Sequence, residues 1–145
     1  MQVNPKITFF VPDFDNPMET SFISSEIKAG FPSPAADFEE SKVSLDHLLI
    51  KNKEATFYAK ASGNSMIGAG IDDGDILVID RSLEPRNNAV SVCFIDGEFT
   101  VKRIKKTEEA IFLIPENPNY APIQIEPHNE FIIWGIVTYV IKQIK

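Results

Sequence analysis

The stretch of sequence that decides the fold is Ala89-Val-Ser-Val-Cys-Phe-Ile-Asp-Gly-Glu-Phe-Thr-Val-Lys-Arg-Ile104. Two runs rich in β-branched and aromatic residues, 89–95 and 98–104, flank the pair Asp96-Gly97. An Asp-Gly pair between two such runs is typical of a tight β-hairpin, because these residues adopt the positive φ angles that the turn requires. The sequence therefore predicts an antiparallel hairpin in this part of the chain.

Further short strands are predicted on both sides of this hairpin. They share β-branched and aromatic residues and are separated by turn signals such as Asp73-Gly74. With the two arms of the hairpin, the predicted strands are Thr56–Ala61, Asp75–Asp80, Ala89–Ile95, Glu98–Ile104, Ala110–Pro115 and Phe131–Ile141. No helical pattern of about 10 to 15 residues separates them, which favours an antiparallel sheet folded on itself over a parallel α/β design. We expect a mainly β domain, with one or two turns of helix at Ser44–Ile50.

Length and charge exclude several classes of protein. A chain of 145 residues with 43% hydrophobic residues is long enough for one domain with a real core. Its 14 Lys and Arg against 21 Asp and Glu give a net charge of −7, so we expect no direct binding of nucleic acid, which depends on cationic side chains. The longest apolar run, Phe131–Ile141, is shorter than the ~20 residues of a membrane-spanning helix. With no secretory signal visible, the expected location is the cytoplasm, without membrane contact.

Metal and cofactor chemistry is not expected. The chain has one cysteine, Cys93, and two histidines, His47 and His128, which form no cluster with the spacing of metal ligands. We interpret Cys93 as a buried and inert residue, since Val92 and Phe94 flank it.

The first 42 residues differ in pattern from the rest of the chain. They contain five prolines and show no sustained period of 2 or 3.6 residues. We therefore predict that residues 1–42 form an extended N-terminal arm and residues 43–145 the β domain.

One turn carries a candidate nucleophile. Ser65 lies in the glycine-rich segment Ser62-Gly-Asn-Ser-Met66, which follows a predicted strand. A serine hydroxyl needs a neighbouring base to become a nucleophile. His47 falls in the short helical patch and His128 in a predicted loop, so a Ser-His-Asp triad stays open but has no support from the pattern.

A neutral lysine is the other base that serves a serine. Lys102 lies in the strand 98–104, where alternation places Thr100 on the same face. A lysine that acts near neutral pH needs its pKa lowered by about 3 units, or roughly 4 kcal/mol, by burial or by like charges. We expect Arg103, Lys105 and Lys106 to contribute part of this shift. From pattern alone, however, a serine in a glycine-rich turn is far more often a structural turn residue, and a lysine in a strand is far more often a solvated side chain.

Four motifs in order give a family resemblance. They are Ala29-Gly-Phe-Pro-Ser-Pro-Ala-Ala-Asp37, Ser62-Gly-Asn-Ser-Met66, Asp73-Gly-Asp75 and Asp96-Gly-Glu-Phe-Thr-Val-Lys102. Together they resemble the UmuD and LexA family of self-cleaving serine peptidases, from Ala29 to the C-terminus. The resemblance implies a small, strongly bent antiparallel β domain like that of LexA and signal peptidases.

The resemblance also assigns roles to residues. It implies that Ser65 is the nucleophile, that Lys102 is its general base, and that the bond between Ala29 and Gly30 is cut. The backbone N–H groups of Ser65 and Met66 are then expected to stabilise the oxyanion. Small residues at the cut suit an extended arm that lies close to the nucleophile.

The partners follow from the same resemblance. It implies that a RecA filament on single-stranded DNA stimulates the cut, and that residues 30–145 form a homodimer that joins a UmuC-like Y-family DNA polymerase for error-prone lesion bypass in the SOS response. The alternative is a dimeric polymerase accessory that does not cleave itself and in which Ser65 and Lys102 are relics. We do not expect a LexA-type repressor, because the 29 residues before Gly30 show no helix-turn-helix pattern. A membrane-bound signal peptidase is not expected either, for want of a membrane segment.

Overall fold

The computed structural model describes residues 7–15, 17–23, 29–30 and 40–145. The chain divides into two compact units, the first formed by residues 1–12 and 52–145 and the second by residues 13–51. The sequence motif at 31–37 lies outside the described residues. No helix of the described part of the chain is long and apolar enough to cross a membrane.

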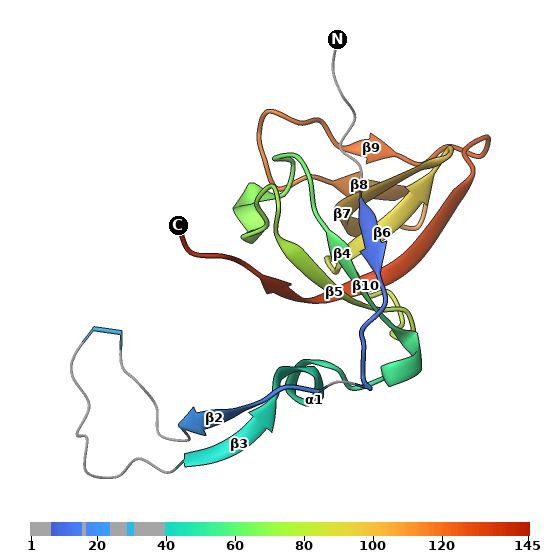
Figure 1. The fold of residues 1–145 in the computed structure, drawn as a ribbon. Coiled ribbons are helices and arrows are strands. Elements are labelled where there is room, and N and C mark those ends of the chain that lie inside the picture. The colour runs from blue at the N-terminus through green and yellow to red at the C-terminus, as the bar shows by residue number, and fades with distance from the viewer. Residues whose placement is uncertain (1–6, 16, 24–28, 31–39) are drawn as a thin grey trace. The chain divides into compact units, whose positions relative to one another are not determined.

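The first unit is one antiparallel sheet of eight strands (Figure 1). Its order is β1-β4-β5-β10-β6-β7-β8-β9. The strands are β1 (Thr8–Phe10), β4 (Thr56–Lys60), β5 (Ile76–Asp80), β6 (Val90–Ile95), β7 (Glu98–Lys106), β8 (Ile111–Ile114), β9 (Ile123–Gln124) and β10 (Phe131–Ile141). Two 3₁₀ turns, η2 (Lys53–Ala55) and η3 (Ile67–Ala69), accompany them. The predicted fold class, mainly antiparallel β, is confirmed.

The hairpin predicted from the sequence joins β6 to β7. Asp96 and Gly97 have φ angles of 47° and 88°, so both turn residues are left-handed, as a two-residue hairpin loop requires. This turn sets the register in which Ser91 lies opposite Lys102.

Strand β10 runs through the middle of the sheet and bends it. Its register shifts between Ile133 and Gly135 against β6, and again between Val137 and Tyr139 against β5. Such irregularities increase the local twist and bend of a strand. A Cβ at Gly135 would lie 2.5 Å from Cγ2 of Ile79, so only glycine fits at this close approach.

The core of the first unit is aliphatic. Its buried side chains come from most of the strands and from the segment around Ser65; the larger cluster contains Ala59, Ala61, Met66, Ile71, Leu77, Ile79, Val92 and Val101. Phe9 of β1 packs on this cluster, with its ring 4.9 Å from Phe99 and 4.6 Å from Trp134. Burial of these surfaces holds the short strand β1 in the sheet.

The second unit is built on an antiparallel pair, β2 (Glu19–Ile23) and β3 (Glu40–Ser44), followed by the helix α1 (Leu45–Leu49). The short helix predicted at Ser44–Ile50 is thus confirmed. Ala29 and Gly30 form an exposed bend in the connection between β2 and β3.

The structure contains four strands that the sequence did not predict. Three of them, β1, β2 and β3, fall within or reach into residues 1–42, where only an extended arm was expected, and the fourth is β9. They have two to five residues, too few to show a period, and β1 owes its place to partners far along the chain. The boundary predicted between residues 42 and 43 stays a prediction.

Candidate active site

Ser65 lies on the loop that joins β4 to β5. Gly63 and Gly70 have φ angles of 90° and 80° and enclose the loop segment that carries Ser65 and the turn η3. Glycine adopts these angles without the strain of a Cβ. The glycine-rich composition therefore serves to turn the backbone twice within a few residues.

Residues 116 and 117 hold this loop from one side. The backbone N–H of Glu116 donates to the Ser65 carbonyl at 2.9 Å, and the N–H of Gly68 donates to the Glu116 carbonyl at 2.8 Å. The Asn117 amide donates to the Asn64 carbonyl at 2.8 Å. A Cβ at Gly68 would lie 2.7 Å from the Glu116 oxygen, so this contact requires glycine.

A turn at residues 72–75 holds the loop from the other side. The N–H of Ala61 donates to the Asp75 carbonyl, and the N–H of Gly74 donates to the Ala61 carbonyl, both at 2.8 Å. The N–H of Gly63 donates to the Asp73 carboxylate at 2.9 Å. The backbone just before Ser65 is thus fixed to this turn.

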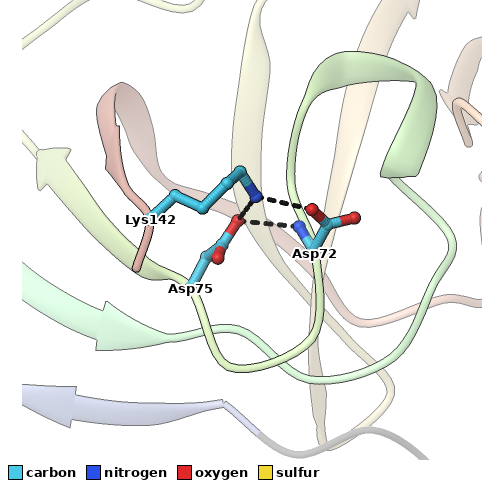
Figure 2. Close-up of polar contacts among 3 residues, drawn as sticks. All are labelled: Asp72, Asp75 and Lys142. Carbon is cyan, nitrogen blue, oxygen red and sulfur yellow. Dashed lines mark hydrogen bonds and ion pairs between the residues drawn. The ribbon is translucent and has the colours of Figure 1, made fainter. Parts of the chain in front are cut away.

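Lys142, directly after β10, closes the turn. Figure 2 shows its ammonium group between the carboxylates of Asp72 and Asp75, while the N–H of Asp72 donates to the Asp75 carboxylate. The Asp75 side chain is only 7% exposed. The two aspartates raise the pKa of Lys142 through hydrogen bonds and charge attraction. A cation from the last strand thus neutralises two carboxylates that support the serine loop.

Lys102 lies on β7 and reaches Ser65. Its Nζ is 2.9 Å from the Ser65 Oγ, 2.7 Å from the Thr100 Oγ1 and 3.1 Å from the Val101 carbonyl oxygen. The residue is only 7% exposed, and within the described ranges no carboxylate forms an ion pair with it.

These three contacts suit an uncharged amine. A neutral amine has two N–H donors and one lone pair. Donation to Thr100 and Val101 leaves the lone pair to accept the hydrogen of the Ser65 hydroxyl. The arrangement therefore places a base at hydrogen-bond distance from the serine.

Burial lowers the pKa of Lys102, and the nearby Cys93 opposes this with a smaller effect. We expected the cations Arg103, Lys105 and Lys106 to help lower the pKa of Lys102, but they do not contribute to this shift. Arg103 points to the other face of β7, where it pairs with Glu116, and both lysines are exposed. Cys93 is fully buried, which raises the pKa of its thiol to about 12. It is therefore buried and protonated, as the sequence suggested.

A pocket of about 210 Å³ opens beside Ser65 and Lys102. Most of its walls are apolar, and they include Ile7, Met66, Ile71, Phe99 and Ile123. Ile7 directly precedes the edge strand β1 and Ile123 lies on the opposite edge strand β9, so residues from both edges of the sheet line one pocket. The sheet is bent strongly enough to bring its edges to the same site.

The backbone beside the nucleophile offers free donors. In the part of the chain that the structure describes, the N–H groups of Ser65 and Met66 donate to no protein acceptor. The neighbouring groups are used, for example the Ile67 N–H, which donates to Asn64. These are the two N–H groups that the family resemblance assigns to an oxyanion hole, and that role stays a prediction.

The predicted site residues are divided between the two units of the chain. Ser65 and Lys102 are in contact in the first unit, whereas Ala29 and Gly30 belong to the second. His47 and His128 are exposed and do not line the pocket. Among the described residues, no group of His, Cys, Asp or Glu could hold a metal ion.

The sequence did not indicate that Thr100, Asn117 and Lys142 support the site through hydrogen bonds. Thr100 was noted on the face of Lys102, and this alternation could have indicated the contact. Asn117 and Lys142 gave no local signal, because their partners Asn64 and Asp75 are 53 and 67 residues away.

Comparison with known proteins agrees with the fold. A family model described as Peptidase S24-like matches residues 21–138. The chain is 36% identical over 135 residues to the protein ImpA of Salmonella typhimurium, covering 92% of this chain and 91% of that one. It is 40% identical over 119 residues to the protein MucA of Escherichia coli, covering 81% of each. The LexA repressor of Bordetella avium is 35% identical over 116 residues, which cover 80% of this chain and 54% of the repressor.

The family match spans most of the strands together with Ser65 and Lys102, whereas Ile7 and Lys142 lie outside it. The matches confirm the resemblance that the four sequence motifs indicated. The chain belongs to the Peptidase S24-like family.

Proposed function

We propose that this chain is a serine peptidase that cuts its own Ala29–Gly30 bond, with Ser65 as nucleophile and Lys102 as general base. The observation that carries the proposal is the 2.9 Å contact between the Lys102 Nζ and the Ser65 Oγ, made by a buried lysine with a lowered pKa. A nucleophile within hydrogen-bond reach of a base is the arrangement that acyl transfer requires. The exposed bend at Ala29 and Gly30 offers a small-residue bond to this pair.

The first chemical step forms an ester. Neutral Lys102 accepts the Ser65 proton as the Oγ attacks the Ala29 carbonyl carbon, and the N–H groups of Ser65 and Met66 bind the oxyanion. Protonated Lys102 then gives its proton to the Gly30 nitrogen, the C–N bond breaks, and Ala29 is left as an ester of Ser65.

The second step restores the enzyme. Neutral Lys102 takes a proton from a water molecule, which attacks the ester carbonyl. The ester bond breaks, Lys102 returns the proton to the Ser65 Oγ, and the segment 1–29 ends in a carboxylate. The net reaction is hydrolysis of one peptide bond, and the dyad is left unchanged.

The biological setting in the proposal is the SOS response in the cytoplasm. Residues 1–42 act as the arm that carries the bond, and residues 43–145 as the peptidase and dimerisation domain. A RecA filament on single-stranded DNA stimulates the cut, and a homodimer of residues 30–145 joins a Y-family polymerase of the UmuC kind. Family membership and the likeness to ImpA, MucA and the LexA repressor support this setting. The net charge of −7 supports contact with proteins rather than directly with DNA.

Mass analysis of the purified chain tests the peptidase. Incubation with an activated RecA filament, or at raised pH, should remove 29 residues and leave a new N-terminus at Gly30. The Ser65→Ala and Lys102→Ala variants should stay folded and intact, with cleavage reduced by at least about 100-fold. A folded wild-type chain that stays uncut under both conditions would refute the proposal, as would cutting by either variant at a rate close to that of the wild type.

The alternative is an accessory subunit that does not process itself. It predicts that the intact chain captures the polymerase as well as the processed chain does. A pull-down with both forms separates the two functions, because stronger capture by the processed form favours the peptidase.

A further inference from the structure

The two strands before the proposed cut both pair with strands after it. Strand β1 pairs with β4 over three residues, from Thr8 opposite Lys60 to Phe10 opposite Tyr58. Strand β2 pairs with β3 over five residues, from Glu19 opposite Ser44 to Ile23 opposite Glu40. Figure 1 shows the two pairs, one in each unit of the chain.

The cut falls in a connection and not in a strand. Ala29 and Gly30 follow the end of β2 at Ile23 and precede the start of β3 at Glu40. Hydrolysis of the bond between them therefore breaks the chain without removing a backbone pair of either ladder. We name residues 1–29 the leader segment.

Side chains add to the backbone pairing of β1. The Phe9 ring meets Phe99 edge-on and lies against Trp134, and Ile7 packs on the same buried cluster. Phe9 is partly buried in these contacts, and aromatic anchors contribute strongly to the affinity of protein interfaces. The β4 edge, together with the rings of Phe99 and Trp134, is a binding site for an extended strand that carries an aromatic residue.

We propose that the leader segment stays bound to residues 30–145 after the cut, held at two sites by β1 and β2, so that cutting and shedding are separate steps. The position of the cut rests on the proposed function. Because both strands belong to one peptide, opening of one pair leaves the other in place, and the free strand rebinds from a high local concentration. Shedding requires both pairs to be open at once, and it uncovers the β4 edge for another strand.

The test uses a foreign protease, so that it does not depend on self-cleavage. In the full-length Ser65→Ala chain, the recognition sequence of a site-specific protease is inserted between Ala29 and Gly30. After complete digestion, the sample passes through a size-exclusion column at micromolar concentration, and mass analysis identifies the peptides in the peak. We expect the leader segment in the same peak as residues 30–145.

Trp134 gives a second measurement, since it is the single tryptophan of the chain. Its emission should stay constant during digestion and shift to the red only when the leader segment leaves and exposes the indole to water. The rate of that shift after dilution measures the dissociation of the leader segment.

Phe9→Ala is the decisive variant and Phe10→Ala its matched control. Phe10 lies on the same strand but is 46% exposed and has no ring contact with Trp134. The leader segment with Phe9→Ala should dissociate at least about tenfold faster than the unsubstituted one. The leader segment with Phe10→Ala should dissociate at the unsubstituted rate.

Either of two results would overturn the inference. One is separation of the unsubstituted leader segment in the first column run, and the other is equal dissociation rates for the Phe9→Ala and Phe10→Ala leader segments. A wild-type chain that fails to cut itself would count against the proposed function alone, because the foreign protease supplies the cut here.

Discussion

At the scale of single residues, the proposed chemistry depends on Lys102. Its side chain is buried and has hydroxyl and carbonyl oxygens as partners in place of a carboxylate. Burial disfavours the charged form and lowers the pKa. Under the proposed function, the same residue therefore governs both the rate of cleavage and the dependence of stability on pH.

The rate of self-cleavage should rise with pH and then level off. Only neutral Lys102 accepts the Ser65 proton, so the rate follows the neutral fraction and reaches a plateau above the lowered pKa. Single-turnover rates between pH 6 and pH 11 check this. A rate that is flat across the range in which Lys102 titrates would contradict its role as a base.

Lys102→Met should stabilise the fold near neutral pH. Between the lowered pKa of the folded state and the ordinary lysine pKa of 10.5, the unfolded chain binds more protons at this position than the folded chain. The wild-type free energy of unfolding therefore rises with pH in this window. Melting temperatures should show the advantage of the variant at pH 7 and its decrease towards pH 10.5.

Thr100→Val should slow self-cleavage by about three- to tenfold. The Thr100 hydroxyl is 2.7 Å from the Lys102 Nζ and orients the amine towards Ser65. Loss of one such hydrogen bond is worth about 0.5–1.5 kcal/mol. The matched control is Thr100→Ser, which keeps the hydroxyl and should cleave at nearly the wild-type rate.

Cys93 should resist thiol reagents in the folded protein. The thiol is fully buried and its pKa is raised to about 12, so the reactive thiolate is scarce as well as shielded. Labelling at pH 8 should be negligible in buffer and reach one thiol per chain in denaturant. Rapid labelling of the folded chain would show that β6 opens readily.

Some site residues could be predicted from the sequence and others could not. Ser65 and Lys102 are ordinary in type and position, and only the order of several motifs singled them out. The loop supports Asn117 and Lys142 depend on pairs formed across 53 and 67 residues, which no local pattern encodes.

At the scale of the elements, the end of β10 and the turn at 72–75 act together on the serine loop. Lys142 neutralises Asp72 and Asp75. The turn that contains these two residues is hydrogen-bonded to Ala61 and Gly63 of the serine loop. Without the cation, two carboxylates face each other and Asp75 is buried without its charged partner. The turn would then hold the loop less firmly.

Lys142→Met should therefore slow self-cleavage several-fold and lower the melting temperature by a few degrees. The midpoint of the pH–rate profile should stay unchanged, because Lys142 acts on the position of Ser65 and not on Lys102. Lys142→Arg should restore most of the rate. Lys145→Met, which removes an exposed charge three residues further on, is the matched control and should behave as wild type.

The predicted strands were found where the chain has long β-branched or aromatic runs. All six appear within one residue of their predicted bounds, except that β7 extends two residues further than predicted, to Lys106. The missed strands β1 and β9 are three and two residues long and exist because neighbouring strands offer them an edge. Such strands are a property of the assembled sheet, so the local sequence cannot indicate them.

At the scale of the whole molecule, the two units differ in how they are stabilised. The buried aliphatic core lies between Ala59 and Leu113 of the first unit. Among the residues of 13–51 whose burial is described, no apolar side chain is buried. A lone two-stranded ladder is only marginally stable in water.

Limited proteolysis should reflect this difference. In the Ser65→Ala chain, trypsin should cut first after Lys42 and Lys51 of the second unit, because local opening there costs little free energy. Lys60 is also exposed but lies on β4, between β1 and β5, and serves as the internal control. Mass analysis of early fragments checks the order, and early cutting at Lys60 would contradict it.

The reaction pocket has walls from the two opposite margins of one curved sheet, at Ile7 and at Ile123. The curvature of the sheet therefore sets the distance between these two walls of the pocket. A substitution that straightens β10 near Gly135 would flatten the sheet, move Ile7 and Ile123 apart and so widen the pocket.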